Sequence, residues 1–297
     1  MKQDMKEQLL TKRPIDLLFQ LSIPAVIGMI VIGLYPLMDG IFAGKIIGQT
    51  AMTACGVAMP LTFFNSGVST LLGVGSASVL SRAIGKGEQK TVNKIMGNLI
   101  YWVIFFSVII TVGGILLAPH FLTMVGATGE IKAYGIRYLR VIFIGSLFVN
   151  FTQSANMVMR GEGLMKKAMT IMGLGALLNI ILDPILMIVM GEYAIEGAAL
   201  ATIIAQFVQA IVTLHHFMKK SKVVKIHKIK SDMEIKKEMF GVGSSAMMMQ
   251  LLLMIQQTIL YKMAFKYGGD PNGILMSAAL RVYAFSFIPL WGMSQGL

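Results

Sequence analysis

The sequence predicts an all-α protein that crosses a membrane several times. Of its 297 residues, 56% are hydrophobic and only 13% are charged, and the mean hydropathy is +0.73. Soluble domains are usually about 45–50% apolar and about 25% charged, so water is not the main solvent of this chain. Apolar runs near or above the roughly 20 residues that span a bilayer recur along its length. Because lipid offers no partners to backbone polar groups, we expect these runs to be helices.

Eight apolar runs predict eight transmembrane helices. The first run follows the basic tail MKQDMKEQLLTKRP and is too long for the core of a signal peptide, so we expect it to remain in the protein as helix one. The runs lie at about 15–38, 53–80, 95–118, 134–158, 168–190, 196–217, 239–262 and 273–297.

The basic residues between the runs predict the orientation and the domains. The N-terminal tail and alternate connections hold most of the 26 lysines and arginines, which places the N-terminus in the cytoplasm. The lysine-rich segment 218–238 divides a six-helix unit, residues 1–217, from the first two helices of a second, repeated unit, residues 239–297. We interpret this segment as an orienting cytoplasmic linker, with binding to anionic lipid or a regulatory arm as the alternatives.

Composition excludes several other classes of protein. The single cysteine, Cys55, cannot form an intrachain disulfide, and four scattered histidines do not suggest a metal site. The formal charge of +12 does not predict a nucleic-acid partner, because no stacking aromatics are interleaved with the basic residues. The glycine-rich run LLGVGSAS lacks the Gly-Lys-Ser/Thr of a phosphate loop. We therefore expect no cofactor.

Two acids lie inside the apolar runs, Asp39 and Asp183. A carboxylate at the depth of Asp183 costs about 2.5–3.5 kcal/mol, which suggests a function or a buried partner. Asn179 lies four residues earlier on the same helix face and can offer its amide to the same cavity. Asp39 lies near the outer end of the first run, where it is either an acid that faces an internal cavity or an interfacial acid that caps the following loop. Both acids fall toward the noncytoplasmic half and could share one site.

Prolines and amides inside the runs have two interpretations each. Pro184 frees the carbonyl of Ile180, and Pro24 is expected to bend the first helix, so both are candidate hinges or packing features. Amides within the helices either form interhelical hydrogen bonds or line a substrate cavity. Those that we consider for the cavity are Asn150, Gln153, Asn156 and Gln256.

Six motifs in a fixed order identify a related family. They are IPAVIGMIVIGLYPLMDGIFAGKIIG, GVGSASVLSRAIGKGE, MVGAT, NMVMRGEG, LNIILDPILMIV and GAALATIIAQ. Over essentially its whole length the chain therefore resembles the multidrug and toxic-compound extrusion (MATE) family of efflux transporters. The resemblance implies two six-helix lobes and alternating access around a central cavity. Because it implies twelve helices, we expect the chain to be truncated in its second lobe.

The resemblance also implies a function and a site. It implies a bacterial, multi-pass cell-membrane antiporter, not an enzyme, that exports organic and often cationic compounds in exchange for Na⁺ or H⁺. The complete protein is expected to be a monomer among membrane lipids, without a cofactor or a nucleic-acid partner. The implied coupling-ion residues are Asp39, Asn179, Asp183 and Thr202, supported by Tyr138 and Asn150.

Two alternative functions compete with this one. A lipid-linked saccharide flippase of related fold would need a basic cavity for its pyrophosphate head group, whereas the buried charges predicted here are acidic. Arg281 is the basic residue left inside the eighth run. An intramembrane aspartyl protease could use two membrane aspartates as a dyad, but neither acid here lies in a Gly-x-Gly-Asp motif.

Overall fold

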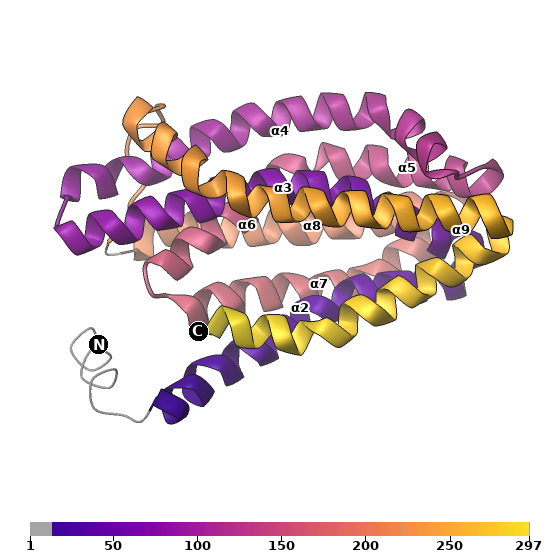
Figure 1. Cartoon of the computed structure of the whole chain (residues 1–297), viewed down its shortest axis with the longest axis horizontal. Coiled ribbons are helices and arrows are strands. Elements are labelled where there is room, and N and C mark those ends of the chain that lie inside the picture. The colour runs from indigo at the N-terminus through magenta and orange to yellow at the C-terminus, as the bar shows by residue number, and fades with distance from the viewer. Residues whose placement is uncertain (1–13, 222, 297) are drawn as a thin grey trace.

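The computed structural model describes residues 14–221 and 223–296, and the regular structure within these ranges is helical (Figure 1). The side chain of Pro24, a predicted hinge, lies outside the described set, although the helix continues through that position. The elements in chain order are α2 (Pro14–Ile46), α3 (Gln49–Lys86), α4 (Gln89–Val125), α5 (Gly129–Ile144), α6 (Ser146–Gly161), α7 (Met165–Met190), η1 (Gly191–Tyr193), α8 (Ala194–His215), η2 (His216–Lys220) and α9 (Met233–Gly296).

The lengths and hydropathies of these helices match an all-α polytopic membrane fold. Five helical segments of the described chain are long and apolar enough to cross a membrane, or six if the bent pair α5 and α6 counts as one crossing. Two of these segments, Met165–Lys220 and Met233–Leu290, each reverse direction, the first between α7 and α8 and the second within α9 (Figure 1). Each of the eight apolar runs therefore lies in its own arm of the bundle or, for the fourth run, in the bent pair.

The fourth run and the last reversal differ from simple straight helices. Helices α5 and α6 meet at Gly145 with a bend of 58°. A Cβ at Gly145 would lie 2.6 Å from the side chain of Ile203, so the missing side chain lets α8 pack into the bend. At Gly269, φ is 60° and ψ is −159°, a conformation that side-chain-bearing residues rarely adopt. Glycine at this position thus allows α9 to fold back on itself. The part of α9 before Gly269 is its first arm, and the part after Gly269 is its returning arm.

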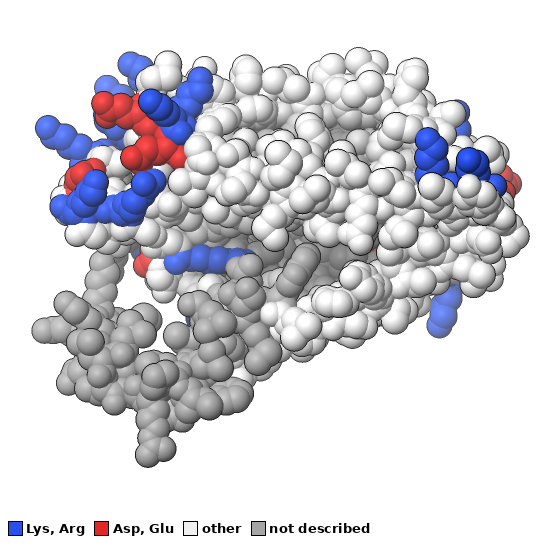
Figure 2. All heavy atoms as spheres, viewed as in Figure 1, with Lys and Arg blue, Asp and Glu red and all other residues white. Residues whose placement is uncertain are grey.

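On the face of the bundle that Figure 2 shows, charged side chains gather at the two ends, with a largely uncharged belt between them. At the end formed by the α3–α4 turn and the start of α9, Lys94 pairs with Asp232 at 2.8 Å and Arg82 with Glu238 at 3.3 Å. Large apolar side chains elsewhere on the helices remain open, for example Ile188 at 67% exposure. An extended apolar surface of this kind suits contact with lipid.

Helix α3 is the central packing element, in contact with α2, α4, α5, α6 and α9. Glycines allow the first arm of α9 to approach it closely. A Cβ at Gly75 would lie 2.1 Å from the Met239 carbonyl oxygen, and one at Gly243 would lie 2.0 Å from the Leu71 carbonyl oxygen. Small residues that let backbones meet are the usual helix contact in membranes. The residues after the linker are therefore packed directly on the six-helix unit.

Hydrogen bonds hold the linker between η2 and α9 against the charged end of the bundle. The Glu162 carboxylate accepts from the Val224 backbone N–H at 2.9 Å, and the Asn98 side chain accepts from the Asp232 N–H at 3.0 Å. The Lys94 ammonium hydrogen-bonds Asp232 and holds the pKa of that carboxyl below its usual range. The linker is consequently docked along the helix ends.

Candidate functional site

Two carboxylates lie buried where α2 and α7 pack together. Asp39 of α2 is 5% exposed and Asp183 of α7 is fully buried, and Asp39 is close enough for its charge to act on Asp183. Asn179, one turn before Asp183, donates from Nδ2 to Asp183 Oδ1 and to Thr202 Oγ1 of α8, both at 3.2 Å. The fold therefore brings together the four residues that the sequence motifs assigned to a coupling-ion site.

Further side chains surround Asp39. Tyr138 of α5 lies within hydrogen-bonding reach of its carboxylate. Tyr35 lies four residues before Asp39, hence on the same face of α2, and both acids act on its hydroxyl. Arg281, from the returning arm of α9, donates from Nη1 to the Pro36 carbonyl at 2.5 Å and acts on the charge of Asp39. Asp39 thus has contributions from three helices around it.

Several oxygens of this cluster are buried without a hydrogen-bond partner in the described chain. They are Asp39 Oδ1, Asn179 Oδ1 and Asp183 Oδ2. Buried acceptors that lack a donor cost free energy, so such a group of oxygens is expected to receive a cation or a proton. A proton turns one carboxyl oxygen into a donor, whereas Na⁺ would be held by the oxygens directly. The all-oxygen set fits a hard cation rather than a soft transition metal.

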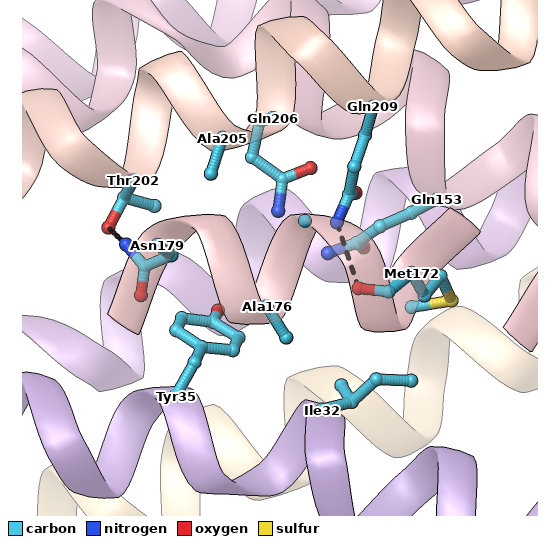
Figure 3. A pocket seen from close by; sticks show the side chains of 11 residues that line it. Ile32, Tyr35, Gln153, Met172, Ala176, Asn179, Thr202, Ala205, Gln206 and Gln209 are labelled. Atoms are coloured by element: carbon cyan, nitrogen blue, oxygen red, sulfur yellow. Dashed lines mark hydrogen bonds between the residues drawn. The ribbon is translucent and has the colours of Figure 1, made fainter. Parts of the chain in front are cut away.

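A cavity of about 100 Å³ adjoins the cluster (Figure 3). Asn179 and Thr202 lie at one end of it, and Gln209 lies at the other, donating to the Met172 carbonyl at 3.1 Å. Gln206 lines the middle, and its side-chain oxygen is buried without a partner in the described residues. The cavity therefore extends the polar cluster along α7 and α8 with groups that can donate or accept hydrogen bonds.

The structure places two of the predicted amides away from this cavity. Asn150 is fully buried, accepts a hydrogen bond from the Ser69 hydroxyl and donates to Ser107 Oγ at 3.0 Å, so it joins α3, α4 and α6. Asn156 donates to the Ala168 carbonyl at 2.8 Å and joins α6 to α7. Both amides therefore have the interhelical hydrogen-bonding arrangement that the sequence left open.

The other predicted residues differ in position. Gln153 of α6 lines the cavity, and Pro184 lies inside α7 directly after Asp183. Gln256 is exposed on the first arm of α9 and does not line the cavity. Gln153 is thus part of the cavity wall, Pro184 interrupts the hydrogen bonding of α7 beside Asp183, and Gln256 lies on an open face of α9.

Sequence reasoning did not assign four residues that the structure places at the site. Tyr35 precedes Asp39 by one helical turn, and Gln206 and Gln209 follow Thr202 at helical spacing, so each shares a face with a predicted residue. Arg281 had a signal of its own, since it is a cation inside an apolar run. Its position corrects the expectation that the buried charges here are only acidic.

Membrane-length apolar arms, two buried carboxylates and an adjoining polar cavity define a polytopic membrane protein of the transporter class. The chain belongs to the MatE family, whose model matches residues 24–185. This is the family of multidrug and toxic-compound extrusion transporters that the sequence motifs resemble, and its members are transporters rather than enzymes.

Named relatives agree with this assignment. The chain is 27% identical over 280 residues to the multidrug export protein MepA of Staphylococcus aureus (strain MRSA252), which covers 93% of the chain and 61% of MepA. It is similar to the structure of the MATE multidrug transporter DinF-BH in complex with a dye, with a TM-score of 0.88 and 30% identity. The match covers 96% of this chain and 64% of DinF-BH. The inward-facing structure of a multidrug resistance MATE family transporter matches with a TM-score of 0.85 and 30% identity, covering 94% of this chain and 63% of that transporter. The chain thus spans about 61% of the curated relative's length.

Proposed function

We propose that the protein works in secondary active export, moving organic and often cationic compounds out of the cell in exchange for Na⁺ or H⁺. The observation that carries the proposal is the group of buried oxygens on Asp39, Asn179 and Asp183, beside Thr202, that have no hydrogen-bond partner among the described residues. Support for multidrug substrates comes from MepA, named a multidrug export protein, and from DinF-BH, whose structure contains a bound dye.

The coupling follows from the charge of the site. With both carboxylates ionised the cluster carries two negative charges in a low-dielectric interior, and an entering cation or proton removes one of them. A membrane potential adds roughly 2.3 kcal/mol per charge per 100 mV to drive that entry. Neutralisation changes which hydrogen bonds α2, α7 and α8 can make, and Pro184 gives α7 a place to bend. Ion occupancy thereby biases the position of these helices around the cavity.

The arrangement in the cell follows from the same reasoning. We propose that the N-terminus and the basic linker lie in the cytoplasm of a multi-pass cell-membrane protein, because lysine and arginine are concentrated on that side. The complete protein is proposed to be a monomer, since two lobes in one chain supply both walls of a central cavity. Anionic lipid at the basic linker is a further expected contact.

The experiment is substrate efflux from vesicles under an imposed sodium or proton gradient, with the complete protein encoded by the gene. Asp183→Asn keeps the shape of the side chain but removes its charge, so we expect it to abolish ion-driven efflux at normal expression. Asp270→Asn is the matched control, because Asp270 is exposed at the reversal of α9. Wild-type efflux by Asp183→Asn at matched protein levels would place the coupling site elsewhere.

A flippase for lipid-linked saccharides fits this site less well. Its pyrophosphate head group carries negative charge, and Arg281 is accompanied by the two carboxylates Asp39 and Asp183. An anionic head group entering the cluster would therefore meet a net negative site, whereas a cation would be attracted.

A further inference from the structure

Arg281 is a buried cation whose partners are backbone carbonyls. It is 7% exposed, and it donates from Nη1 to the Pro36 carbonyl at 2.5 Å and from Nη2 to the Met52 carbonyl at 3.3 Å. Its Nε is buried without a hydrogen-bond partner in the described residues. Charged side chains at membrane depth are rare and mark functional positions by default, so this arginine calls for an explanation beyond packing.

The shape of α2 admits the guanidinium next to the acid. Pro36, Asp39 and Gly40 lie within one turn of the helix, so they share a face. A Cβ at Gly40 would lie 2.3 Å from Arg281 Nη1 and 2.4 Å from its Cζ, which means that the guanidinium lies directly over a position without a side chain. The charge of Arg281 acts on the Asp39 carboxylate, whose Oδ1 has no hydrogen-bond partner in the described part of the chain. The two opposite charges therefore lie near each other, although the described residues include no ion pair between them, and each group has a buried hydrogen-bonding atom without a partner in that part of the chain.

The arginine comes from a different part of the chain than the acids. It lies on the returning arm of α9, beyond the linker and the reversal at Gly269, and this arm runs beside α2 (Figure 1). One turn earlier on the same arm, Ser277 is fully buried and donates to the Met52 carbonyl at 3.4 Å. The sequence assigns this arm to the second lobe, whereas Asp39 and Asp183 belong to the first. The contact thus joins the cation site to the part of the protein that should move relative to it.

We propose that Arg281 is a tethered cation that competes with the coupling ion for the Asp39–Asp183 site, so that ion occupancy is linked to contact between the lobes. The inference rests on the proposed ion-coupled function. While the guanidinium is in place, it balances one of the two carboxylate charges. The guanidinium then repels an entering cation, and the site holds that cation more weakly. When the arm withdraws, the site regains its second negative charge and holds the cation more strongly. By linkage, a bound cation must favour withdrawal of the arm to the same degree.

The variants isolate charge, position and packing in the complete protein. Arg281→Met removes the charge at similar length, and Arg281→Lys keeps a charge that cannot bridge both carbonyls as a guanidinium does. Gly40→Ala keeps the arginine but displaces its head. The matched control is Gly44→Ala one turn later on α2, where a Cβ would lie 3.5 Å from the nearest atom, Met52 Sδ, an ordinary contact.

Two quantities are measured. Equilibrium binding of radiolabelled sodium to the purified protein tests Na⁺ as the coupling ion, and the pH midpoint of substrate exchange tests H⁺ as the coupling ion. For Arg281→Met we expect cation affinity to rise about tenfold, within the roughly 5–150-fold range of such couplings, while coupled efflux falls. Gly40→Ala should raise affinity in the same direction, Arg281→Lys should raise it less, and Gly44→Ala should match wild type. A purely structural arginine would give unchanged or lower affinity when removed.

The outcomes separate this inference from the function on which it rests. Unchanged or lower cation affinity in both Arg281→Met and Gly40→Ala, with binding abolished by Asp183→Asn, would overturn the role of Arg281 and leave the ion site standing. Wild-type cation binding and pH midpoint in Asp183→Asn would instead overturn the site itself. If Arg281→Met fails to insert, Gly40→Ala decides, because it keeps the arginine and its charge.

Discussion

The close contact between α3 and the first arm of α9 predicts opposite effects for two glycine substitutions two residues apart. At Gly243 a new Cβ would lie 2.0 Å from the Leu71 carbonyl oxygen and 2.8 Å from the carbonyl carbon, whereas at Gly241 no atom of the described residues lies within 4 Å. Alanine in place of glycine in a helix gains about 0.8–1 kcal/mol at either position. Overpacking costs about 1–3 kcal/mol, and the upper end applies at Gly243 because a backbone atom cannot change rotamer.

We therefore expect Gly241→Ala to stabilise the protein by up to about 1 kcal/mol and Gly243→Ala to destabilise it by about 1–2 kcal/mol. The assay is the temperature at which the detergent-solubilised protein loses its monodisperse form. At about 2–4 °C per kcal/mol, the two variants should differ by roughly 5–10 °C. Equal midpoints for the two variants would refute the reasoning, because they would mean that the arms do not meet at this glycine.

Three further predictions concern the site, the orientation and the linker. Asn179→Ala should weaken cation affinity by about 1–2 kcal/mol, roughly 5–30-fold, and so less than Asp183→Asn, because a neutral ligand and its hydrogen bonds are lost; equal losses in sodium binding would contradict this. A cysteine in place of Lys228, in a cysteine-free background, should react with impermeant reagent only from the cytoplasmic side, and labelling from outside intact cells would reverse the orientation. The Asp232–Lys94 pair should hold the linker at neutral pH, because docking lowers the pKa of the Asp232 carboxyl. The stabilisation of the docked linker is then complete above the usual pKa of about 3.9 and is lost as pH falls through the lowered pKa. Linker accessibility that changes near pH 7 would count against this pair.

The apolar runs determined the class of protein and the places where helices lie. A run of about 20 apolar residues must satisfy its backbone internally in lipid, so helix positions follow from composition without tertiary information. The same argument isolated Asp39 and Asp183, because a carboxylate inside such a run is costly wherever the run packs. The bend at Gly145 carried no comparable signal, since the close packing that requires glycine there comes from the side chain of Ile203 on another helix.

Which polar side chains meet was decided by the tertiary structure alone. Helices that are apolar nearly all round carry little periodicity, so the sequence does not say which face turns inward. The spacing placed Asn179 beside Asp183, but it left the role of Asn150 open, and only the packing shows that Asn150 joins α3, α4 and α6 while Asn179 links Asp183 to Thr202. The meeting of Arg281 with α2 depends on close approach at Gly40, a contact between residues more than 200 positions apart. Sequence thus determined which groups are costly to bury, and helix packing determined which of them share a site.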